Sequence, residues 1–178
     1  RDEYSDDKCD SVDVVLSGFG RWDTHAGPSN LRWGPDNAIW GAVGYSSYNS
    51  PTLDQFGSGL WRWDPKEGDP EFIAQFTNNT WGLGFRGDGE IFGSTANGAP
   101  SFFVGAPKNF TGRTSPNAPG AAPVASTALF HPALEELHQG DYLGEFTAAA
   151  GHSFATGSQI PDGWNDRSAF VCGPTGHL

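Results

Sequence analysis

The sequence predicts an all-β fold, and three observations support this. Of 178 residues, 25 are Gly, 13 are Pro and 7 are Trp, while only 17% are charged, which is typical of a turn-dense, aromatic-rich chain. A helical bundle would need more Leu, Ala, Glu and Lys. Short segments in which apolar and polar residues alternate recur between turn residues. The length fits one domain with its own core.

A segment near the N-terminus recurs 52 residues later. LRWGPDNAIWGAV (31–43) aligns with LGFRGDGEIFGST (83–95). Each copy breaks at Asp-Asn or Asp-Gly and resumes with Ile, an aromatic residue and Gly, which predicts a β-hairpin closed by a tight turn. Asp36 and Asp88 are interpreted as turn residues, because Asp favours this position through local hydrogen bonds.

Further strands complete each repeat. LWRWD (60–64) and EFIAQF (71–76) predict a strand pair after the first hairpin, and SVDVVLSG (11–18) predicts a strand before it. Hairpins recurring at this interval suggest propeller blades. A looser third unit is expected to contain strands within 146–157 and 167–172, joined by a turn at PDGWN (161–165).

We therefore predict a β-propeller segment of about three antiparallel blades, near 11–76, 77–104 and 128–178. The stretch 105–127 is rich in Pro, Ala and Gly and is expected to be an inserted surface loop. One or two helical turns are expected at 131–139. Because closed propellers need at least four blades, other copies of the chain or missing blades must close the ring.

The charge excludes some partners. The formal net charge of -11 repels phosphate backbones and anionic lipid surfaces, so neither nucleic acid nor a membrane is an expected partner. The chain starts at Arg1 and contains no Met, which predicts a processed product or a piece of a larger protein. Cys9 and Cys172 either form a disulfide that ties the ends together or stay as two buried free thiols, and no haem-attachment motif is present.

Long phrases of the chain resemble known dehydrogenases. HAGPSNLRWGPDNAIWGAVGY (25–45) and NNTWGLGFRGDGEIFGSTANG (78–98) resemble two blades of soluble quinoprotein glucose and aldose dehydrogenases. DTHAGPSNLRWG (23–34) and AFVCGPTGHL (169–178) are more similar to the planctomycete-type "membrane-bound dehydrogenase" propellers. This resemblance covers most of the chain from Val14 to Leu178.

The resemblance implies a six-bladed parent or assembly that oxidises a sugar or another alcohol with pyrroloquinoline quinone (PQQ). His25 is the expected general base, which takes the hydroxyl proton, and Asp23 is expected to orient its ring. Asn79, His152 and Thr175 are the expected cofactor-binding residues. Three departures stand out. The spacing from His25 to Leu31 is one residue longer than in the sugar enzymes, and Thr175 falls near the position of a basic residue that grips the quinone. His152 and His177 stand where those enzymes usually have no His.

Other interpretations of these residues remain open. His25 can instead cap a backbone carbonyl in a structural turn. His25, His152 and His177 can form a metal-binding cluster, although no local spacing supports one. The acidic residues Asp6, Asp7, Asp10 and Asp13 are interpreted as a solvated face, with a calcium site as the alternative. Five Trp residues are expected to pack inside the blades and two, next to loops, to be exposed for stacking: Trp33, Trp40, Trp61, Trp63 and Trp81, then Trp22 and Trp164.

Two functions of different class follow. The first is a PQQ-dependent dehydrogenase with a sugar or alcohol substrate. The second is a non-catalytic propeller module for self-assembly or for glycan or protein binding. The sequons at Asn78 and Asn109 and the resemblance both favour a periplasmic or extracellular location.

Overall fold

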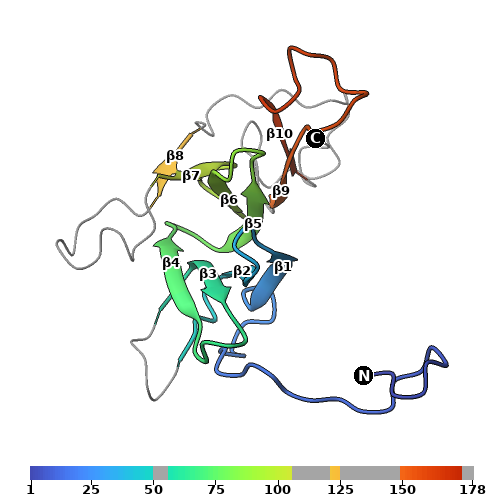
Figure 1. Ribbon diagram of the computed structural model, residues 1–178. Helices are drawn as coiled ribbons and strands as arrows, with labels where there is room; N and C mark the ends of the chain where they lie inside the picture. The colour runs from blue at the N-terminus through green and yellow to red at the C-terminus, as the bar shows by residue number, and fades with distance from the viewer. Residues whose placement is uncertain (50–55, 106–120, 125–148, 174–178) are drawn as a thin grey trace, which may run out of the picture.

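The computed structural model describes residues 1–49, 56–105, 121–124 and 149–173, and within these ranges the protein is all-β, as predicted. Three antiparallel sheets follow one another along the chain (Figure 1). Sheet 1 pairs β1 (Pro28–Trp33), β2 (Ile39–Val43), β3 (Gly59–Trp63) and β4 (Glu71–Gln75) in that order. Sheet 2 pairs β5 (Thr80–Phe85), β6 (Ile91–Thr95), β7 (Phe102–Val104) and β8 (Ala122–Pro123), and sheet 3 pairs β9 (Ala150–Phe154) with β10 (Ala169–Cys172). None of the described segments is a helix with the length and apolar character needed to cross a bilayer.

The internal repeat has the same strand register in both copies. Trp33 opposes Ile39 in sheet 1, and Phe85 opposes Ile91 in sheet 2, so each residue of the second pair lies 52 positions after its equivalent in the first pair. The hairpin turns repeat as well, because Asn37 and Gly89 both adopt positive φ angles, of 61° and 91°. Asn and Gly tolerate this left-handed conformation better than other residues, which explains their place in the two turns.

The two turn carboxylates act as predicted. Asp36 Oδ1 accepts a hydrogen bond from the Ala38 amide at 3.3 Å, and Asp88 Oδ1 accepts one from the Glu90 amide at 3.1 Å. Such Asx-type bonds close the turn locally. The interpretation of Asp36 and Asp88 as turn residues is therefore confirmed.

The main apolar core lies between sheets 1 and 2. Leu60 of sheet 1 and Leu83 of sheet 2 are fully buried there, and Phe76 stacks on Phe102 with ring centroids 4.7 Å apart. The other buried members are Ala38, Trp40, Ala42, Ile73, Ala74, Ala99 and Val104. Since a fully buried Leu or Phe side chain stabilises by about 1.5–3 kcal/mol, this core holds the two sheets together.

The opposite face of sheet 1 is only partly covered. Trp61 is buried there, with the Phe19 ring at 5.0 Å between centroids and Tyr48 packed in the same cluster. Leu31 and Trp33 lie on the same face, but 63% and 67% of their surfaces are exposed. The prediction that Trp33 packs inside a blade was wrong, because no described residue covers this edge of sheet 1. Burial of Trp40, Trp61 and Trp63 is confirmed, as is exposure of Trp22 and Trp164, while Trp81 is half-buried.

Some predicted elements differ from the structure. Residues 11–18 form no strand: Val12 and Val14 are exposed and find no neighbouring strand within the described ranges, and β propensity alone does not create one. Sheet 2 takes in β8, which comes from the stretch predicted as an inserted loop. The helical turns expected at 131–139 lie outside the described residues.

Both cysteines are free and exposed. Cys9 lies in the N-terminal segment, where its Sγ is 3.4 Å from the Ser11 carbonyl oxygen, and Cys172 ends β10. Neither sequence-based alternative describes them, since the thiols are not bonded to each other and not buried.

Candidate functional site

The segment before β1 and the loop after β2 lie side by side. The Gly44 and Ser46 amides both donate to the Ala26 carbonyl, at 3.0 and 3.2 Å. The buried Ser46 hydroxyl donates to the Asp23 carbonyl at 2.6 Å. The Asp23 carboxylate accepts a hydrogen bond from the His25 amide at 2.8 Å. These bonds fix the turn that carries His25 against sheet 1.

The start of β5 joins the same region. The Tyr45 hydroxyl donates to Asn78 Oδ1, and Asn79 Nδ2 donates to the His25 carbonyl at 3.2 Å. Polar and aromatic side chains from both repeats therefore meet at one end of sheets 1 and 2. We call this group the rim and define it by Trp22, Asp23, His25, Tyr45 and Asn78.

The His25 side chain stands at the rim and is 88% exposed. Its Nδ1 lies 3.5 Å from Asp23 Oδ1, which is close enough for electrostatic attraction but long for a hydrogen bond. A carboxylate next to Nδ1 favours the proton on that nitrogen and leaves Nε2 as the acceptor. Both backbone groups of His25 are bonded, the amide to Asp23 and the carbonyl to Asn79. The geometry thus fits a base oriented by Asp23, and that role stays a prediction.

Asn79 is buried and faces the interior of the fold. Only 9% of the residue is exposed, and its amide nitrogen is used by the His25 carbonyl. Its Oδ1 is buried and finds no hydrogen-bond partner in the described parts of the chain. That oxygen lies against Gly44, where an added Cβ would overlap it. Asn79 therefore positions the main chain of the rim, and its side-chain amide is enclosed by the fold.

His152 lies on β9 and packs against sheet 2. It is 2% exposed, and its Nε2 lies 3.0 Å from Ser101 Oγ. The ring stacks on Phe92 with centroids 5.6 Å apart and also contacts Phe154. Burial lowers the pKa of His152 to about 4, and the positive charge of Arg32 adds to the shift. The imidazole is therefore neutral at pH 7.

The structure does not bring His152 to the rim. The hydrogen bond and ring contacts that it makes within the described ranges are with Ser101, Phe92 and Phe154, and none is with His25. Thr175 and His177, the other predicted members of the site, lie outside the described residues.

A cavity of about 440 Å³ lies beside His152 between sheets 2 and 3. Arg86 reaches it, but this guanidinium already bonds Glu90 at 2.8 Å and the Asp166 carbonyl at 3.1 Å. The remaining lining residues are Phe92, Ser101, Val124, Phe154, Asp166, Arg167 and Ala169. Sequence reasoning missed Ser101, since no local motif links it to a histidine that lies 51 residues away.

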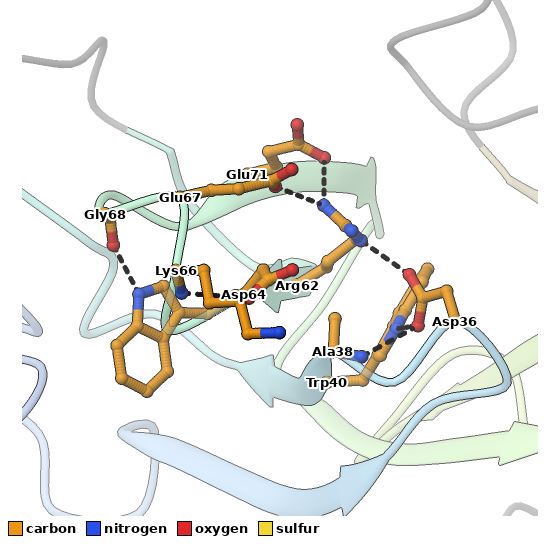
Figure 2. A network of polar contacts seen from close by, with 10 residues as sticks. Asp36, Ala38, Trp40, Arg62, Asp64, Lys66, Glu67, Gly68 and Glu71 are labelled. Atoms are coloured by element: carbon orange, nitrogen blue, oxygen red, sulfur yellow. Dashed lines mark hydrogen bonds and ion pairs between the residues drawn. The ribbon is translucent and has the colours of Figure 1, made fainter.

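Sheet 1 carries a second polar cluster, centred on Arg62 (Figure 2). Its guanidinium bonds Asp36 at 2.6 Å and Glu71 at 3.1 Å, and Trp40 Nε1 donates to the same Asp36 carboxylate at 2.8 Å. Burial on its own raises the pKa of Asp36, but the hydrogen bonds from Arg62, Trp40 and the Ala38 amide lower it below its ordinary value. Arg62 is bonded to carboxylates of the same sheet, so the cluster is structural.

The acidic N-terminal segment contains one compact carboxylate group within the described ranges. Ligand atoms of Asp2, Asp6 and Asp10 lie within 4.8 Å of one another, and all three residues are exposed. Their carboxylates accept local bonds, such as the Glu3 amide on Asp10 at 2.8 Å. These local bonds account for the arrangement of the carboxylates. The structure therefore gives no support for calcium binding beyond the sequence pattern itself.

Comparison with known proteins identifies the family. No curated protein and no solved structure is significantly similar to the chain. One family model, described as "Domain of unknown function (DUF7133)", matches residues 1–178. Since this match covers the whole chain, the chain belongs to the DUF7133 family.

Proposed function

We propose that the three sheets are successive propeller blades and that the rim binds a neutral polyhydroxylated ligand, a sugar or a related alcohol. The meander order of sheets 1 and 2 supports the blade assignment, because each runs β1 to β4 or β5 to β8 without a crossover. The strands β1, β5 and β9 lie along the same side of the array, as inner blade strands do (Figure 1).

The observation that carries the ligand assignment is the composition of the rim. Trp22 and Tyr45 are 70% and 43% exposed, and large aromatic faces of this kind stack on the apolar faces of sugar rings. Asp23, His25 and Asn78 provide acceptors and donors for hydroxyl groups beside them. The net charge of -11 disfavours an anionic ligand. A neutral ligand with many hydroxyl groups fits these features best.

The test is calorimetric titration with neutral saccharides as probes: glucose, galactose and maltotriose. We expect Trp22→Ala to weaken binding at least about tenfold, since aromatic residues carry much of the binding energy at such surfaces. The matched control is Trp164→Ala, which removes another exposed Trp outside the rim. Equal losses in both variants, or no binding of any probe by the unaltered chain, would contradict the proposal.

The quinone-dependent dehydrogenase predicted from the resemblance has support only from the exposed imidazole of His25 and its neighbour Asp23. PQQ carries several carboxylates and needs positive charge around it. No rim contact in the described ranges involves Lys or Arg, and Asn79 faces away from the surface with its amide already bonded. These residues do not fit the cofactor.

Binding of the quinone separates the two functions. In an absorbance titration with PQQ and calcium, we expect no stoichiometric uptake by the 178-residue chain. Uptake of one quinone per chain, lost in Asn79→Ala, would favour the dehydrogenase instead. His25→Ala would then be the next variant to assay.

A further inference from the structure

In sheets 2 and 3, the aromatic residue that ends the first strand packs on the second strand of the preceding sheet. Phe85, at the end of β5, contacts Trp40 of β2 edge to face, with ring centroids 5.4 Å apart. Phe154, at the end of β9, contacts Phe92 of β6 in the same way, with centroids 4.9 Å apart. Two successive interfaces between sheets therefore use one repeated contact.

The strand registers identify the residue of sheet 3 that is equivalent to Trp40 and Phe92. These two residues oppose Arg32 and Gly84, each one position before the end of an inner strand. In sheet 3 the residue one position before the end of β9 is Ser153, and it opposes Phe170. Phe170 therefore occupies the position that receives an aromatic ring from the next sheet.

The first sheet lacks the other half of this contact. Trp33 ends β1 and is equivalent to Phe85, but within the described ranges no sheet precedes sheet 1. Without a preceding sheet among the described residues, this edge of sheet 1 stays exposed. Leu83 is fully buried, whereas Leu31, its equivalent in the repeat, is 63% exposed. Trp33 and Phe170 are 67% and 60% exposed, which is high for side chains of this size.

From these contacts we infer that copies of the chain bind one another head to tail, with sheet 1 of one copy packed against sheet 3 of the next. Trp33 of one copy packs edge to face on Phe170 of the next, as Phe85 packs on Trp40 within a chain. Both faces belong to the same polypeptide, so a second copy can supply the missing half of each aromatic contact. A contact between two different faces closes into a ring when the rotation permits and otherwise extends into longer oligomers.

The experiment measures mass by native mass spectrometry and light scattering, over a range of protein concentrations. The unaltered chain is expected to self-associate, and Trp33→Glu and Phe170→Glu are each expected to be monomers, with at least a tenfold weaker association. Trp22→Glu, an exposed Trp at the rim, is the matched control and should associate normally. Melting curves of the monomeric variants check that folding is intact.

Mixing the two variants tests the head-to-tail geometry. The Trp33→Glu chain keeps Phe170, and the Phe170→Glu chain keeps Trp33, so an equimolar mixture is expected to form a heterodimer with one intact interface. The proposal fails if the mixture stays monomeric, if either variant alone still associates, or if the unaltered chain is a monomer at all concentrations. The last result would mean that further sheets of a longer polypeptide, and not a second copy, cover these faces.

Discussion

Gly44→Ala should destabilise the protein strongly, and a second substitution should relieve most of the loss. An added Cβ at residue 44 would overlap Asn79 Oδ1 and lie 2.8 Å from Asn79 Cγ and 3.0 Å from the Ala26 Cα. Overpacking of this kind costs about 1–3 kcal/mol. If Asn79 moves away, its bond to the His25 carbonyl is also lost, which adds about 1 kcal/mol. We expect a total of about 2–4 kcal/mol.

Asn79→Ala removes the obstacle. It loses one hydrogen bond but also removes a buried oxygen without a partner in the described residues, so we expect a change of only about 1 kcal/mol. The contact of the added Cβ with the Ala26 Cα remains, so the double variant should be only about 1 kcal/mol less stable than Asn79→Ala alone, with a coupling energy of roughly 2 kcal/mol.

Urea unfolding followed by Trp fluorescence measures these differences. Gly27→Ala is the control, since nothing lies within 4 Å of its added Cβ, and it should be neutral or slightly stabilising. Additive effects of Gly44→Ala and Asn79→Ala would refute the reasoning, because they would show that the two residues do not touch.

Three further predictions concern stability. The pKa of His152 is about 6.5 in the unfolded chain and about 4 in the folded protein, so the free energy of unfolding should fall by up to about 3 kcal/mol as the pH drops from 6.5 to 4. The urea midpoint of His152→Phe should depend less on pH than that of the unaltered chain. Asp36→Ala should cost about 1–2 kcal/mol, because the Ala38 amide, Trp40 and Arg62 lose their acceptor, while Asp88→Ala should cost less; equal losses in urea unfolding would contradict this. Leu83→Ala should cost about 2–5 kcal/mol and Leu31→Ala below about 1 kcal/mol in dilute solution, and a large loss at Leu31 would show that its face is covered within one chain.

Local patterns in the sequence were sufficient to predict several features. The 52-residue repeat predicted two equivalent hairpins, and the registers of β1 with β2 and of β5 with β6 agree with it. The turn roles of Asp36 and Asp88 were predictable because an Asx bond involves residues only two positions apart. The strand predicted at 11–18 failed because a strand needs a neighbour, and no local pattern reveals whether one is present.

The candidate site was predictable only in part. His25 and Asp23 are close in sequence, so their proximity at the rim could be expected. Asn79 was expected to face a ligand, but its amide bonds a carbonyl 54 residues away and its oxygen is enclosed by Gly44. His152 was expected beside the cofactor and instead lies in the interface between sheets 2 and 3, bonded to Ser101.

Sequence alone determined that this chain is all-β and where its repeated hairpins turn, because turn chemistry and alternation act over a few residues. Tertiary structure decided which equivalent positions are buried. Leu31 and Leu83 have the same place in the repeat, yet among the described residues only Leu83 has a sheet in front of it. Burial depends on contacts between segments far apart in the chain, and a local pattern carries no information about whether the next sheet is there.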